Sequence, residues 1–187
     1  MKGRLRTIRI ASTFIICSLL FLFPMAAFPA GPPVKGATLP SFQLPAPTLE
    51  TDMSYLGLKG ATFRLKDISC QVLVIEIIGV YCARCYQQAP LFNKLFARLN
   101  RKGTGDKVKM LAIAAGGTAN ETEHLRKTGA YEFPVVSDET YAVHKLMGEP
   151  RTPFTLLIDR EGKVLFTHLG VIEDVDTFYQ QIVELVK

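Results

Sequence analysis

The sequence predicts an α/β domain in which helices cover both faces of a central mixed β-sheet. Residues 72–78 (VLVIEII) form an almost unbroken β-branched run, which is typical of a strand buried on both faces. In residues 90–99 the apolar positions 91, 92, 95, 96 and 99 follow the stripe of an amphipathic helix. Strands and helices then alternate before a hairpin and a last helix, and this order requires a mixed sheet with helices on both sides.

The composition is that of a globular protein with a single core. The chain has 187 residues, of which 48% are hydrophobic and 21% charged. Four of the 22 Lys and Arg residues lie before residue 30, which leaves 18 against 17 Asp and Glu. The rest of the chain is therefore electrically balanced and offers no basic field for phosphates, so nucleic acid is excluded as a partner.

Residues 1–30 are predicted to be a secretory signal peptide. Basic residues are followed by an apolar centre at residues 14–23 (FIICSLLFLF), and then by prolines and small residues. An uncleaved membrane anchor is the alternative, because the apolar run of residues 10–28 is about long enough to span a bilayer. Cys17 lies in this run as an apolar filler. Either interpretation places the remainder outside the cytoplasm, in the periplasm or another extracytoplasmic space.

The exported part divides into a flexible tether at residues 31–40 and a domain at residues 41–187. Residues 31–60 are rich in Pro, Gly and Thr, so the domain is expected to begin with an irregular lead-in. Residues 62–65 (TFRL) alternate like a short strand. Further extended segments are predicted at residues 108–114, 133–136, 154–159 and 163–168, and helices at residues 121–128, 139–147 and 175–186. Residues 160–162 form the turn of the hairpin.

The chemistry is expected at Cys82 and Cys85, directly after the central strand. If a helix begins near Cys82, its thiol lies among free backbone N–H groups at the positive end of the helix, which favours the thiolate. Cys82 is then the nucleophile. Cys85 is close enough, three residues on, to form a disulfide with it and to resolve a mixed disulfide. The positive charge of Arg84 further favours the thiolate.

Two structural alternatives for this pair are half of a zinc site and a static disulfide. Zinc needs about four ligands. The chain has no second CxxC motif, and its three histidines, His124, His144 and His168, are scattered. A purely structural disulfide does not need a strand-to-helix turn. The sequence therefore favours redox work, with no metal.

Glu76 stands within the central apolar strand. An ionised carboxylate there costs several kcal/mol without a partner, so its pKa is expected to be raised. Glu76 precedes Cys82 by six residues, and beneath the CxxC turn it could take a proton from Cys85. A solvated sheet face or a core hydrogen bond would explain the residue equally well.

Together these features resemble the thioredoxin fold. The matching positions are the acid six residues before CxxC, Pro90 five residues after Cys85, and Thr152-Pro153 before residues 154–159 (FTLLID). Within this fold, the exported TlpA-like and ResA-like thiol-disulfide oxidoreductases of the redoxin class are most similar over residues 40–187. The resemblance implies that Pro153 is a cis-proline beside the disulfide, and that Thr152 shapes the peptide-binding groove.

Two departures from the family pattern concern recognition and redox poise. Tyr81 stands where the family usually has Trp, which keeps an aromatic cover for substrate binding. Ala83 and Arg84 replace the common Gly-Pro or Glu-Pro pair, a main determinant of redox potential in the family. Because this pair differs, the redox potential and the direction of electron flow cannot be carried over from the family on the basis of these two residues.

The resemblance implies a protein disulfide oxidoreductase that uses the Cys82–Cys85 pair and no other cofactor. Reduction is favoured over oxidation. The expected partners are cysteine-containing exported proteins, among them apocytochromes c awaiting haem, and a membrane thiol electron relay. Cys70 is the thiol left over after export and is expected to be buried and inert.

Two other functions remain open at this point. A peroxiredoxin shares the fold, although its usual Pro-x-x-x-Thr-x-x-Cys context is absent around Cys70 and Cys82. A copper chaperone of the Sco type would hold Cu(I) with two cysteines and a distant histidine, for which His168 is the candidate. Those chaperones normally space their cysteines as CxxxC.

Overall fold

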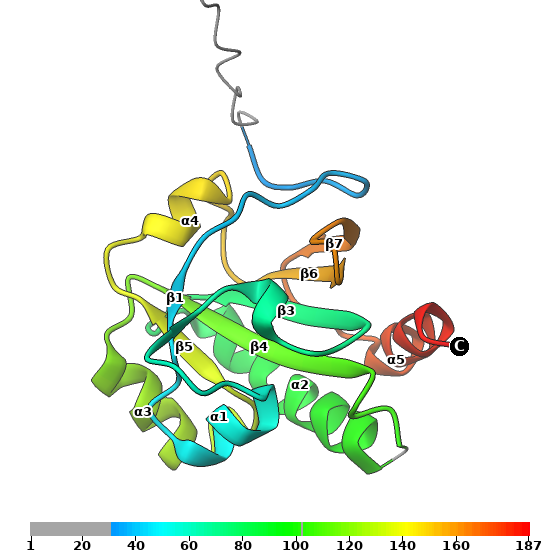
Figure 1. Cartoon of the computed structure of the whole chain (residues 1–187), viewed down its shortest axis with the longest axis horizontal. Coiled ribbons are helices and arrows are strands. Elements are labelled where there is room, and N and C mark those ends of the chain that lie inside the picture. The colour runs from blue at the N-terminus through cyan, green and yellow to red at the C-terminus, as the bar shows by residue number, and fades with distance from the viewer. Residues whose placement is uncertain (1–30, 102) are drawn as a thin grey trace, which may run out of the picture.

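A five-stranded mixed sheet forms the centre of the molecule (Figure 1). The computed structural model describes residues 31–101 and 103–187. The expectations for residues 1–30, a signal or an anchor with Cys17 inside it, lie outside the described residues. Among the described residues, no helix is both long and apolar enough to cross a membrane.

The strand order is β5-β4-β3-β6-β7, with the central strand β3 at Val72–Ile78. β3 pairs in parallel with β4 (Val108–Ala115), and β4 pairs in parallel with β5 (Val135–Asp138). On its other side β3 pairs antiparallel with β6 (Phe154–Asp159), which continues through a hairpin into β7 (Val164–Leu169). The predicted mixed sheet is confirmed, and all seven residues of β3 are buried.

Helices cover both faces of the sheet, as the sequence predicts. On one face a core cluster joins the sheet to α2 (Ala83–Arg101), α3 (Ala119–Lys127) and α5 (Val175–Leu185). Helices α2 and α5 lie side by side on this face (Figure 1). On the other face a second cluster includes Leu56 of α1 (Glu50–Leu56) and Val143 of α4 (Ala142–Leu146).

Helix α2 begins earlier than the apolar stripe of the sequence predicts. The stripe indicates a helix from residue 90, whereas α2 begins at Ala83 and carries Pro90 inside it. The first two turns include the polar residues Arg84, Gln87 and Gln88, which interrupt the apolar pattern. The helix therefore begins directly after Cys82, where the redox hypothesis requires it.

The lead-in is more ordered than its composition predicts. It contains β1 (Leu44–Pro45), α1, β2 (Thr62–Phe63) and the 3-10 helix η1 (Leu65–Asp67), and β1 pairs antiparallel with β2. Residues 36–39, which were predicted to belong to a flexible tether, form backbone hydrogen bonds with the β6–β7 hairpin. The Gly36 N–H donates to the Val164 carbonyl oxygen, and the Val164 N–H donates to the Ala37 carbonyl oxygen. The Leu39 N–H donates to the Gly162 carbonyl oxygen. These backbone bonds, together with the burial of Leu39, fix a segment whose Pro and Gly content indicates a loop.

Candidate functional site

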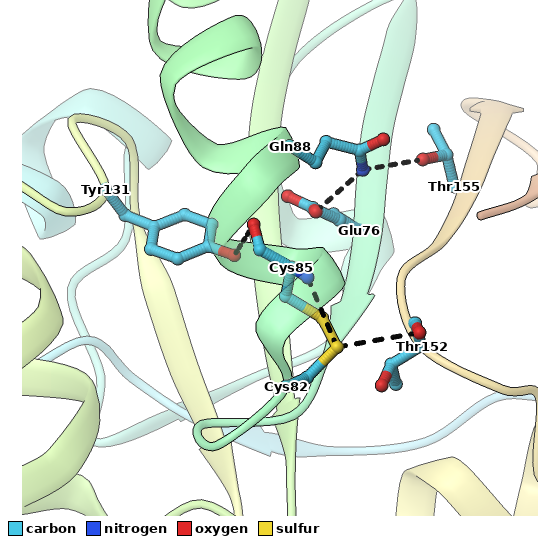
Figure 2. The surroundings of a disulfide bond; sticks show 7 residues. All are labelled: Glu76, Cys82, Cys85, Gln88, Tyr131, Thr152 and Thr155. Atoms are coloured by element: carbon cyan, nitrogen blue, oxygen red, sulfur yellow. Dashed lines mark hydrogen bonds between the residues drawn. A yellow bond between two sulfur atoms is a disulfide. The ribbon is translucent and has the colours of Figure 1, made fainter. Parts of the chain in front are cut away.

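The two cysteines lie where β3 ends and α2 begins (Figure 2). Cys82 immediately precedes α2, and its backbone N–H donates to the Gly79 carbonyl oxygen at 3.1 Å. The backbone N–H of Cys85 donates to Cys82 Sγ at 3.2 Å. Sulfur thus takes the place of the oxygen of an ordinary N-cap residue, and the free N–H groups of the first helical turn favour a thiolate at Cys82.

Cys82 and Cys85 are joined by a disulfide, with their Cα atoms 5.2 Å apart. The two sulfurs differ in access, because Cys82 is half-buried whereas Cys85 is 1% exposed. An incoming thiol or disulfide therefore reaches Cys82, and Cys85 reacts only with its neighbour. This asymmetry matches the roles that the sequence predicts for the two cysteines.

The segment before β6 closes over the disulfide. The Thr152–Pro153 peptide bond is cis, which confirms the expectation drawn from the family resemblance. The Thr152 carbonyl oxygen lies 3.6 Å from Cys82 Sγ (Figure 2). Gly79 lies against both residues, since a Cβ there would be in ordinary contact with Cys82 Cβ at 3.4 Å and with Thr152 Oγ1 at 3.5 Å.

Glu76 is buried behind the cysteines, with an exposed fraction of 1%. Its Oε1 accepts a hydrogen bond from Gln88 Nε2 at 2.7 Å, while its Oε2 has no partner among the described residues. Burial raises the pKa of this carboxyl from 4.5 to about 8, and the Gln88 hydrogen bond only partly offsets the rise. The solvated-face alternative for Glu76 is thereby excluded.

Gln88, Thr155 and Tyr131 surround this carboxyl and were not singled out by the sequence analysis (Figure 2). Gln88 lies one turn after Cys85 on the buried face of α2 and is itself 0% exposed. Its Nε2 also reaches Thr155 Oγ1 at 3.5 Å, and its Oε1 accepts from the Ile172 backbone N–H at 2.7 Å.

Tyr131 lies on the other side of Cys85, where its hydroxyl donates to the Cys85 carbonyl oxygen at 3.5 Å. Burial and the nearby Glu76 charge both raise the pKa of Tyr131 above its usual range. One signal could have found Gln88: extended backwards from residue 92, the helical stripe reaches residues 88 and 85. Thr155 and Tyr131 carry no such signal, because only the folded sheet brings them to Glu76.

Exposed side chains form the rim around the disulfide. Tyr81 is 88% exposed, and its hydroxyl donates to Glu121 Oε1 at 2.6 Å. The other oxygen of Glu121 accepts from the Thr118 backbone N–H and hydroxyl in the capping box of α3. Ala83 and Arg84 are also exposed. The Arg84 guanidinium lies beside Gly170, because a Cβ on that glycine would be 3.7 Å from one of its nitrogens.

The remaining candidate residues lie away from the disulfide. His168 is on β7, His144 is in α4 and His124 is exposed on α3. Within residues 31–101 and 103–187, no three His, Cys, Asp or Glu side chains gather closely enough to hold a metal ion. Cys70 is a free, buried thiol before β3, and burial raises its pKa. It therefore has the properties of an inert packing residue.

Known proteins share both the sequence pattern and the fold. The chain is 29% identical over 108 residues to the thiol-disulfide oxidoreductase ResA of Bacillus thuringiensis, a match that covers 58% of this chain and 60% of ResA. It is 27% identical over 149 residues to ResA of Geobacillus thermodenitrificans, covering 79% and 77% of the two chains. The match to the first of these relatives thus spans less than two thirds of its length.

A solved structure gives a longer match. The crystal structure of a putative thiol:disulfide interchange protein DsbE from Chlorobium tepidum superposes with a TM-score of 0.63 at 27% identity. It covers 82% of this chain and 99% of the other. The Redoxin family matches residues 34–182, which include β1 to β7, both cysteines, Glu76 and the cis-proline. This chain belongs to the Redoxin family.

Proposed function

We propose that the protein is an extracytoplasmic thiol-disulfide oxidoreductase that transfers electrons between its Cys82–Cys85 pair and disulfides of exported proteins. One observation carries the proposal: the pair forms a disulfide at the start of α2, with Cys82 accessible and Cys85 enclosed. The names of the ResA relatives agree with this chemistry. The disulfide itself is the redox group, so the reaction needs no bound cofactor.

In the reducing direction, the reaction begins with Cys82 as a thiolate and Cys85 as a thiol. Cys82 Sγ attacks one sulfur of the substrate disulfide, and the other substrate sulfur leaves and takes a proton from water. Cys85 then loses its proton and attacks Cys82 Sγ, which breaks the mixed disulfide and releases the second substrate thiolate. Two electrons pass from the dithiol to the substrate, and the protein ends as the observed disulfide.

Glu76 is the acceptor for the Cys85 proton in this scheme. Its carboxyl is enclosed with Cys85, Gln88 and Tyr131, a setting without bulk water to take the proton. The acceptor is the ionised form of Glu76, which becomes the major form above a pH of about 8. A carboxyl with this pKa is closer to a thiol in proton affinity than an ordinary Glu is, which makes the transfer less uphill. In the reverse reaction the same group returns the proton to Cys85.

The cleft beside Cys82 suits an extended polypeptide substrate. Pro153 has no backbone N–H, the Thr152 carbonyl lies against Cys82, and Tyr81 offers an exposed ring on the other side. Residues 1–30 export the domain, or anchor it, so its substrates are cysteine-containing exported proteins, apocytochromes c among them. A membrane thiol relay supplies the electrons.

Turnover with a reducible protein tests the proposal. The full-length protein should reduce the interchain disulfides of insulin when a dithiol reductant is supplied, and Cys82→Ser should abolish this activity. Cys70→Ser is the matched control, because it removes the buried thiol and should leave turnover unchanged. Persisting turnover in Cys82→Ser would overturn the proposal.

A further inference from the structure

The buried position of Glu76 raises a question about proton exit, which rests on the function proposed above. Each turnover delivers one proton to a carboxyl that is 1% exposed. Tyr131 offers no exit, because it is also 1% exposed and its hydroxyl contacts the Cys85 carbonyl. Cys85 is enclosed by the disulfide turn. The proton must therefore leave along another side of the carboxyl.

A row of polar side chains crosses the sheet from Glu76 toward its edge. Glu76 on β3 is the register partner of Thr155 on β6, and Thr155 is the register partner of His168 on β7. Direct partners on adjacent strands project from the same face, with Cβ atoms about 5 Å apart. All three side chains therefore lie under α2 and α5, on the face that carries the polar site.

Gln88 holds the inner end of this row in place (Figure 2). Its Nε2 donates to Glu76 Oε1 and to Thr155 Oγ1, at 2.7 Å and 3.5 Å. The Thr155 hydroxyl is 0% exposed and uses an oxygen lone pair in this contact, so its own proton stays available for donation. The unpartnered Glu76 Oε2 lies in the same enclosed space.

His168 forms the outer end of the row. It is half-buried on β7, its Nε2 lies 3.2 Å from the Val171 carbonyl oxygen, and its ring stacks parallel to Phe166. His168 lines a surface hollow of about 330 Å³ between β7 and the start of α5. Glu173 and Asp174 also line this hollow, and both are exposed to water. The His168 ring therefore lies between the buried Thr155 and the water in this hollow.

We propose that Thr155 and His168 form a proton relay that connects Glu76 to the hollow beside α5. The relay leads away from the disulfide and its substrate cleft. It stays open while a polypeptide covers Cys82, when exit past the disulfide is blocked.

The relay moves one proton and no electrons. As Cys85 attacks, its S–H bond breaks and the proton binds the Glu76 carboxylate. Glu76 then gives a proton to the Thr155 oxygen while Thr155 passes its own to the ring of His168, directly or through one bridging water. His168 releases a proton to water in the hollow, and the carboxylate is restored. Imidazole suits this last step because it exchanges protons with water near neutral pH.

The groups around Glu76 are Cys85 and Gln88 from α2, Tyr131 from the segment after α3, and Thr155 from β6. His168 on β7 lies one strand beyond Thr155. The side chains of Glu173 and Asp174 line the hollow at the outer end of the row. His168 acts through Thr155 and Glu76, so it is a relay residue and touches no reacting sulfur.

Rapid-quench measurement of the resolving step tests the relay. Full-length protein is reduced, mixed with excess insulin in weak buffer at pH 8, where Glu76 is partly ionised and can accept the Cys85 proton, and quenched in acid at set times. The mixed-disulfide and fully oxidised forms are then counted by mass. His168→Ala should slow conversion of the mixed disulfide by about a hundredfold, the lower end of what a positioned proton-transfer group contributes. Imidazole added to the buffer should enter the vacated hollow and restore most of the rate.

His168→Asn distinguishes a relay from a structural role. Asn keeps a side-chain N–H donor but does not exchange protons, so its rate should fall as far as that of His168→Ala. His144→Ala is the matched control, because His144 is likewise half-buried with its Nε2 3.0 Å from a backbone carbonyl, that of Pro150. Its rate should stay at the wild-type level.

Two results would overturn the relay. One is conversion of the mixed disulfide at the wild-type rate in His168→Ala. The other is slow conversion in His168→Ala that added imidazole does not restore, together with a wild-type rate in His168→Asn. Both leave insulin reduction by the wild-type protein intact. Failure of the proposed function is a different result, in which the wild-type protein forms no mixed disulfide through Cys82.

Discussion

At the scale of single residues, burial of the Glu76 carboxyl makes the stability of the folded state depend on pH. The folded state holds a proton on this carboxyl up to a pH of about 8, whereas the unfolded chain releases it near 4.5. Between these values the folded state binds more protons, so stability falls as pH rises. The fall is at most about 1.4 kcal/mol per pH unit.

Glu76→Gln should remove this pH dependence. The amide cannot ionise and fits the same space beside Gln88, so the variant should be similar to wild type at pH 5 and more stable at pH 8. Urea unfolding of the oxidised proteins at both pH values measures the difference. Glu184→Gln is the control, because the Glu184 side chain is exposed on α5. Equal pH slopes in wild type and Glu76→Gln would contradict the assignment.

Tyr81 owes its position to a contact that is distant in sequence. Its hydroxyl is held by Glu121, which also caps α3, so the aromatic cover is fixed to that helix. Tyr81→Ala should raise the KM for a protein disulfide several-fold while changing turnover of a small aromatic disulfide less. Tyr81→Phe keeps the ring but removes its hydrogen bond, so its KM should lie between those of the wild type and Tyr81→Ala. Equal effects on both substrates would refute a role for Tyr81 in substrate binding.

At the scale of elements, one ion pair fastens the lead-in to the rest of the domain. Arg126 of α3 donates two hydrogen bonds to the Asp52 carboxylate of α1, at 2.7 and 2.6 Å. Asp52 is 2% exposed, and Arg126 also donates to the Tyr131 carbonyl oxygen. The pair thus links α1 to the segment that carries Tyr131 toward Cys85.

Arg126→Ala should destabilise the fold by about 3–5 kcal/mol, because it leaves the Asp52 carboxylate buried without a partner. Chemical denaturation measures the loss. Lys127→Ala breaks a neighbouring pair with Glu123, in which the Lys127 side chain is exposed, and should cost about 1 kcal/mol or less. The double variant Asp52→Ala/Arg126→Ala should recover part of the loss. Similar costs for the two single variants would contradict this view of the lead-in.

The elements that could be predicted are those whose burial follows a simple period. The range predicted for the central strand, residues 72–78, matches β3, because every residue there is buried and all of them except Glu76 are Val, Leu or Ile. The range predicted for β6, residues 154–159, also matches. Helix α1 was missed, since Asp52 on its buried side is satisfied by Arg126 from 74 residues away. No local pattern contains that information.

At the scale of the whole molecule, the site divides in the same way. The cysteines could be predicted because their motif follows the central strand directly, and Glu76 because it is the one acid in that apolar strand. The cis bond of Pro153 followed from the family resemblance. Gln88, Thr155 and Tyr131 could not, because the fold alone brings α2, β6 and the segment after α3 to one carboxyl. The reactive residues can therefore be identified from sequence motifs, whereas the polar side chains around them depend on how the strands and helices are arranged.

The most direct test of the central claim is to trap the first covalent intermediate. Reduced Cys85→Ser protein is incubated with an oxidised protein substrate, quenched with acid and an alkylating agent, and examined by peptide mass mapping. A stable mixed disulfide is expected at Cys82, because the serine cannot resolve it, and none is expected in Cys82→Ser. A mixed disulfide at Cys70, or equal trapping in both variants, would contradict the assignment of Cys82 as the nucleophile.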